Sequence, residues 1–193
     1  MKTSHYLIVL AFFSLTFSCK KKEKTQPEVE TNDVEIIEET KPKIKKIKVS
    51  LQPKSDSNVK GTVIFNETDG EVLMTALLEG LSEGDHAIHI HEKADCSAND
   101  GTSTGGHWNP TKSKHGKWGD DSGYHRGDIG NLKADSKGNA SISLKTDEWC
   151  IGCEDPTKNI IGKAIIVHEG IDDFVSQPTG AAGGRISCGG IIE

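Results

Sequence analysis

Two histidines in one short segment are the first candidates for chemistry. Residues 85–92 read DHAIHIHE, so His89 and His91 alternate with Ile88 and Ile90. A β-strand turns successive side chains to opposite faces, and both imidazoles would therefore leave the strand on the same face. Neutral imidazole binds copper, zinc, iron or nickel. The pair predicts half of a transition-metal site.

A second group of donors lies between residues 93 and 128, where no strand pattern is present. Its members are His107, His115, His125 and Asp128. Three imidazoles and one carboxylate suit the tetrahedral coordination of zinc, and a bound ion can order a loop that has no core of its own. Because long loops in compact domains are usually functional or disordered, these donors favour function.

Short apolar alternations predict the strands that must hold these donors. Besides the segment around His89, they recur at residues 47–51, 59–65, 72–78, 129–134, 140–145, 162–168 and 185–189. Turn-forming residues fill 66–70 and 135–139, whereas 93–128 and 169–184 are too long for turns. About eight short strands without an amphipathic helix predict an all-β antiparallel sandwich or barrel with two long functional loops.

Length and charge narrow the class of protein. The 193 residues suit one globular domain with extensions, and 21 glycines with 34% hydrophobic residues fit a turn-rich β domain. The formal net charge of −6 argues against nucleic acid as a partner, because a binder of phosphate backbones shows a clustered basic face. An anionic ligand would have to be attracted by local positive charge.

The N-terminal segment resembles an export signal. Residues 1–19 have a basic start, an apolar core and a final Ser-Cys pair that resembles an imperfect bacterial lipobox, which predicts lipidation of Cys19 and a membrane anchor. An ordinary signal peptide with an incidental cysteine is the alternative. The polar, charged residues 20–44 predict a disordered tether, and residues 45–193 predict the folded domain.

Four cysteines remain once Cys19 is set aside, namely Cys96, Cys150, Cys153 and Cys188. An even number in an exported chain predicts two disulfides, because such bonds persist outside the cytoplasm. The residues alone leave three pairings open.

Five motifs, in family order, resemble the copper/zinc superoxide dismutases. They are HIHE (89–92), GHWNP (106–110) with HG (115–116), HRGDIGN (125–131), VHE (167–169) with DD (172–173), and GGRISC (183–188). The resemblance covers nearly all of residues 45–193. It implies an eight-stranded Greek-key β-sandwich or barrel of immunoglobulin-like architecture, a fold already attributed to these enzymes.

The resemblance also implies roles for individual residues. Copper would be held by His89, His91, His107 and His168, and zinc by His107, His115, His125 and Asp128. His107 would bridge the ions and donate a proton, Asp172 would link His89 to His115, and Arg185 would attract and orient superoxide. His86 is not a ligand on this alignment and is expected to make a structural hydrogen bond.

The implied activity is the dismutation of superoxide outside the cytoplasm, as antioxidant defence. In the family, one superoxide reduces copper and leaves as dioxygen, and a second takes up two protons, reoxidises copper and leaves as hydrogen peroxide, while zinc is structural. Together with the export signal, this activity implies a location in the periplasm or cell envelope. The oligomeric state stays open, and a homodimer is one alternative. The alternative function is a non-catalytic lipoprotein that buffers copper and zinc.

The resemblance also bears on the pairing of the four cysteines. It implies a Cys96–Cys188 disulfide, whereas Cys150 and Cys153 lie outside the common family core. That pair could be redox-active or bind zinc, but no helix pattern follows it, which favours a local structural disulfide. Compared with familiar eukaryotic members, the stretch from Cys96 to His107 is long and the stretch from Glu169 to Arg185 is short.

Overall fold

The computed structural model describes residues 43–193, and eight β-strands form the frame of this part of the chain. The expected signal peptide 1–19 with Cys19, and the expected tether as far as residue 42, lie outside the described residues. The strands are β1 Lys45–Pro53, β2 Lys60–Thr68, β3 Glu71–Glu79, β4 Gly84–His91, β5 Gly130–Ala134, β6 Ala140–Thr146, β7 Ala164–His168 and β8 Arg185–Gly190.

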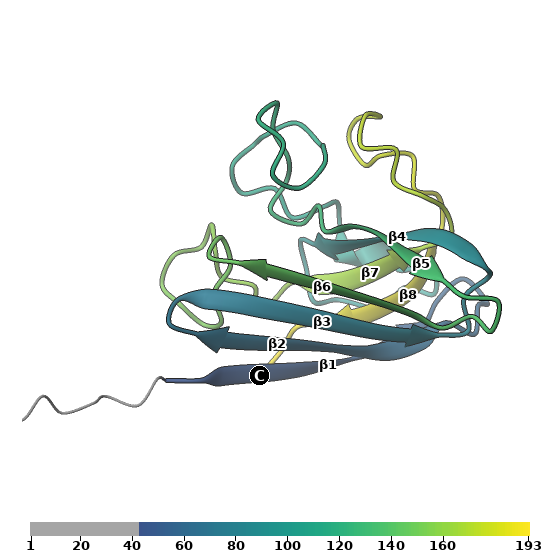
Figure 1. The fold of residues 1–193 in the computed structure, drawn as a ribbon, viewed down its shortest axis with the longest axis horizontal. Helices are drawn as coiled ribbons and strands as arrows, with labels where there is room; N and C mark the ends of the chain where they lie inside the picture. Colours follow the sequence, from purple (N-terminus) through teal and green to yellow (C-terminus); the bar gives the residue numbers. More distant parts are fainter. Residues whose placement is uncertain (1–42) are drawn as a thin grey trace, which may run out of the picture. The chain divides into compact units, whose positions relative to one another are not determined.

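The strands pair antiparallel in the order β5-β4-β7-β8-β1-β2-β3-β6. The turn at residues 135–139 joins the two outermost strands, β5 and β6, so that the sheet nearly closes into a barrel (Figure 1). The β3–β4 and β6–β7 connections lead to strands that are not neighbours, as in Greek-key folds. The predicted all-β class with eight antiparallel strands is confirmed.

Alternation places the core inside this barrel. In β3, Val72, Met74, Ala76 and Leu78 are buried, while the residues between them face outward. The β2–β3 turn is shorter than the expected turn at 66–70, because β2 stays paired with β3 as far as Thr68. Only Asp69 and Gly70 turn, both with positive φ, which is typical of a tight hairpin turn.

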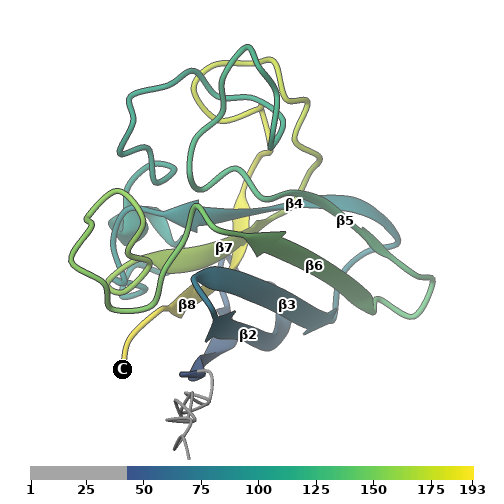
Figure 2. The same cartoon turned by 60° about the vertical axis from the view of Figure 1, so that its left-hand side comes forward.

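Three long connections leave the barrel. The β4–β5 loop (92–129) includes a short 3-10 helix at Thr102–Thr104, and the β7–β8 loop spans 169–184. These two loops lie side by side above β4 and β7 (Figure 2), where the backbone N–H of His115 donates to Gln177 Oε1 and Gln177 Nε2 donates to the His115 carbonyl, each at 2.9 Å. The sequence did not mark the third connection, the β6–β7 loop (147–163), as long.

In the part of the chain that the structure describes, no helix has the length and apolar character needed to cross a membrane.

Candidate metal centre

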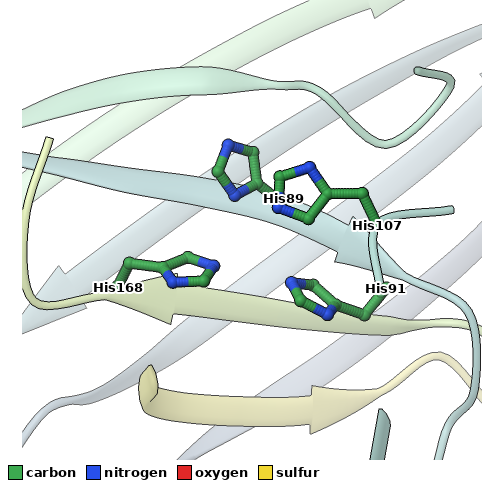
Figure 3. A group of neighbouring side chains, drawn as sticks. All are labelled: His89, His91, His107 and His168. Carbon is green, nitrogen blue, oxygen red and sulfur yellow. The ribbon is translucent and has the colours of Figure 1, made fainter. Parts of the chain in front are cut away.

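The first donor set gathers around β4. His89 and His91 are fully buried on one face of this strand, whereas Ile88 and Ile90 belong to the barrel core on the other face. His168 ends the neighbouring strand β7, and a β-bridge between His91 and His107 brings the β4–β5 loop over the strand. The four imidazoles converge (Figure 3).

The geometry of this set fits a metal ion. One nitrogen atom from each of the four rings lies within 4.8 Å of the others. Nδ1 of His89 and Nε2 of His91, His107 and His168 are buried without a hydrogen-bond partner. Because buried polar atoms are almost always paired, four orphan lone pairs that face one point indicate donors for an ion.

The second donor set is His107, His115, His125 and Asp128 from the β4–β5 loop, and its donor atoms also lie within 4.8 Å of one another. Asp128 Oδ1 is 2.8 Å from His107 Nδ1, and Asp128 Oδ2 is 3.0 Å from His115 Nδ1. His107 therefore belongs to both sets, with Nε2 facing the first and Nδ1 facing the second. Three nitrogens and one carboxylate match a closed tetrahedral zinc site.

Close backbone contacts fix this loop on the barrel. The N–H of Ile90 donates to the Gly127 carbonyl at 2.9 Å, and the N–H of Trp108 donates to the Ile90 carbonyl at 2.8 Å. A Cβ atom at Gly127 would overlap the Ile90 carbonyl oxygen, so the approach requires glycine. These contacts place His107 and Asp128 directly over β4.

Hydrogen bonds on the outer side of the rings orient the donors. The Asp172 carboxylate accepts from Nε2 of His89 and from Nε2 of His115, both at 2.8 Å. His91 Nδ1 donates to the Gly105 carbonyl at 3.0 Å, and His168 Nδ1 lies 3.3 Å from the Gly183 carbonyl. Each bond fixes a tautomer whose other nitrogen faces a donor set, as in known metal sites.

Burial lowers the pKa values of three histidines in the first set and so keeps their rings neutral and able to bind a cation. Burial, together with the neighbouring rings, lowers the pKa of His91 far below its usual range and that of His168 to about 3. Burial also lowers the pKa of His107 to about 4, although a hydrogen bond to Asp128 opposes the shift. These imidazoles are therefore neutral donors at neutral pH.

The two buried carboxyl groups remain ionised. Burial acts to raise the pKa of Asp128 and of Asp172, but hydrogen bonds from the surrounding histidines outweigh it and hold both pKa values below the usual range. Burial likewise opposes protonation of His115, yet the hydrogen bonds to both carboxylates raise its pKa to about 9.

Arg185 begins β8 and pairs in register with His168. Its Nη1 donates to the Gly101 carbonyl at 2.8 Å and to the Thr104 hydroxyl at 2.9 Å, and the side chain is half-buried. The sequence did not predict the acceptors that orient Arg185, His91 and His168. These acceptors are the backbone carbonyls of residues 101, 105 and 183 and the Thr104 hydroxyl. Carbonyl acceptors have no side-chain signature, so no motif could reveal them.

The remaining candidates are also placed. A disulfide joins Cys96 to Cys188 and ties the β4–β5 loop to β8, and a second joins Cys150 to Cys153 in the β6–β7 loop. His86 lies outside both donor sets. Its Nδ1 is 3.0 Å from the His168 carbonyl and its Nε2 is 3.1 Å from the Ser82 hydroxyl, which agrees with a structural role.

A nearly closed eight-stranded barrel with two donor sets that share one histidine defines a binuclear metalloprotein class. The family model for copper/zinc superoxide dismutase (SODC) matches residues 59–191. The chain belongs to the copper/zinc superoxide dismutase family.

Two known proteins illustrate the similarity. An extracellular superoxide dismutase [Cu-Zn] of Caenorhabditis elegans is 36% identical over 137 residues, which are 68% of this chain and 60% of that protein. This chain thus spans less than two thirds of that curated relative. The crystal structure of a double mutant of a SOD-like protein from Bacillus subtilis matches this fold with a TM-score of 0.67. The two sequences are 30% identical, and the match covers 76% of this chain and 97% of that one.

Proposed function

We propose that this protein is a superoxide dismutase that converts superoxide to dioxygen and hydrogen peroxide. The observation that carries the proposal is the pair of buried donor sets joined through His107. Family membership and the chemistry of the donor atoms support it. A protein that only stored metal would not need an arginine beside the first set.

We assign the ions by donor chemistry. The all-nitrogen set of His89, His91, His107 and His168 suits copper, and the set that contains Asp128 suits zinc. Copper bound in the first set would supply the one-electron redox couple that no ordinary side chain provides. The zinc set would hold the β4–β5 loop and add positive charge beside His107.

The chain's own residues would bind and protonate the substrate. Arg185 presents a positive charge next to His168, held in place by the Gly101 carbonyl and the Thr104 hydroxyl. In a protein of net negative charge, that guanidinium would attract and orient the superoxide anion. Nε2 of His107 faces the first set, so whenever this nitrogen is not bonded to an ion it could hold a proton and donate it to the reduced substrate.

Export and anchoring form the second part of the proposal. Two disulfides and the similarity to an extracellular relative support a location outside the cytoplasm. We propose that Cys19 carries a lipid that anchors the domain through residues 20–44 in the periplasm or cell envelope.

The experiment is a metal analysis of the purified protein alongside a superoxide-consumption assay. We expect one copper and one zinc per chain and rapid consumption of superoxide. Full copper occupancy without turnover would refute the enzymatic proposal and favour a protein that buffers copper and zinc.

A further inference from the structure

Two residues of the β6–β7 loop hold the segment that carries His125. The Glu148 carboxylate forms an ion pair with the Arg126 guanidinium and accepts a 2.9 Å hydrogen bond from the Tyr124 hydroxyl. The Trp149 indole N–H donates to the Arg126 carbonyl at 2.9 Å. The residues immediately before and after His125 are thereby both tied to one short stretch of another loop.

Aromatic packing connects this contact to the barrel core. Trp149 is fully buried, and its ring meets Phe65 of β2 and Trp118 edge to face, at centroid distances of 6.1 and 5.2 Å. Trp118 in turn lies 5.0 Å from the Tyr124 ring. Since Phe65 and Trp149 belong to the same core cluster, Trp149 links the barrel core to the β4–β5 loop, in which Trp118 and Arg126 lie.

His125 depends on the contacts of its chain neighbours with the β6–β7 loop more than the other histidine donors depend on theirs. The outer nitrogens of His89 and His115 are held by Asp172, and those of His91 and His168 face backbone carbonyls. Within residues 43–193, no side-chain hydrogen bond holds the outer Nε2 of His125. Its backbone N–H donates to Asp128 Oδ2 at 2.7 Å, so the ring is positioned chiefly through its main chain.

The supporting loop is itself fastened at several points. The Cys150–Cys153 disulfide closes it directly after Trp149, and the N–H of Ile151 donates to Glu67 Oε2 of β2 at 2.7 Å. The ammonium group of Lys45 in β1 donates to the Ile151 carbonyl at 2.6 Å. These contacts fix the loop to two barrel strands.

We propose that Glu148 is a positioning residue for the zinc donor His125. It acts through Arg126 and Tyr124, and Trp149 anchors it to the barrel core. The β6–β7 loop, which supplies no metal ligand, would therefore set the affinity of the zinc set. This inference rests on the zinc assignment in the proposed function.

The test measures zinc affinity by competition with a chromophoric chelator. Glu148→Gln removes the charge and keeps the size, and Tyr124→Phe removes only a hydroxyl. We expect each to weaken zinc binding by about tenfold, at the low end of the effect of removing residues that orient metal ligands. The copper affinity of the zinc-free protein should stay as in the wild type, which separates an effect on the zinc set from a general loss of structure.

The matched control is Glu154→Gln, which alters an exposed glutamate of the same loop and should leave zinc affinity unchanged. Wild-type zinc affinity in both test variants would overturn the inference. If Glu148→Gln fails to fold, the result of Tyr124→Phe decides. A wild-type protein that binds no zinc would instead refute the zinc assignment, so the two failures are distinguishable.

Discussion

Four donor nitrogens, those of His89, His91, His115 and His168, owe their availability to what the opposite side of the ring touches. His89 offers Nδ1 because Asp172 accepts from Nε2, and His91 offers Nε2 because the Gly105 carbonyl faces Nδ1. Burial adds to this at His91 by lowering the pKa of its ring far below the usual range, so that this ring is neutral. A change at one ring should therefore affect the set to which that ring contributes.

Replacing a donor that belongs only to the first set should remove copper binding and leave zinc binding. We expect His91→Ala to abolish copper binding and to reduce superoxide consumption to the uncatalysed background, because one of four nitrogens is lost from a buried site. Zinc content should persist, since His91 is not in the second set. Full turnover in this variant would show that the copper assignment is wrong.

Asp172 orients one ring of each donor set. In Asp172→Asn, an amide cannot accept from both rings as the carboxylate does, so we expect the affinities for copper and zinc to fall by about 10–100-fold. Asp173→Asn changes the adjacent exposed acid and is the control. Equal metal affinities in the two variants would contradict this role for Asp172.

Arg185 should govern the encounter with the substrate. Removing its charge in Arg185→Met should lower kcat/KM by roughly 10–100-fold and flatten its dependence on ionic strength, an effect for which superoxide dismutases are a known example. Arg185→Lys keeps the charge but loses the two-acceptor geometry at Gly101 and Thr104, and should be intermediate. A wild-type rate and salt dependence in Arg185→Met would exclude steering by this residue.

At the scale of elements, loops carry most of the donors, and cross-links limit how far these loops move. The Cys96–Cys188 disulfide closes 92 positions and the Cys150–Cys153 disulfide closes 3. The chain-entropy relation then gives about 4.6 kcal/mol of stabilisation for the first and about 1.6 kcal/mol for the second.

Urea unfolding of the metal-free protein can test which disulfide stabilises the fold more. The Cys96→Ser/Cys188→Ser variant should lose about three times as much free energy of unfolding as the Cys150→Ser/Cys153→Ser variant. A larger loss in the second variant would mean that the short disulfide contributes chiefly through the packing of Trp149, and not through chain entropy.

The sequence predicts the strands well because alternation records which face is buried. Val72, Met74, Ala76 and Leu78 show the pattern and are all in the core. The contact between Trp149 and Arg126 could not be predicted, because two loop residues 23 positions apart meet only through the path of the whole chain. Motifs thus indicate which residues can bind metal, whereas the supports of those residues emerge only in three dimensions.

At the scale of the whole molecule, the proposed anchor places the domain at a membrane. Cys19→Ser should remove the lipid attachment and move the protein from the membrane fraction to the soluble fraction, measured by fractionation and immunoblotting. The Cys150→Ser/Cys153→Ser variant should remain with the membrane as a control. Unchanged membrane association of Cys19→Ser would count against lipidation.

A histidine common to two metal sites has a thermodynamic consequence. With Nε2 on one side and Nδ1 on the other, His107 cannot change its state in one set without changing it in the other. If both sets bind ions as proposed, their occupation is coupled, and linkage requires the coupling to be reciprocal: whatever factor zinc imposes on copper affinity, copper imposes on zinc affinity. The amount of zinc bound would then change how much copper the protein binds at a given copper concentration.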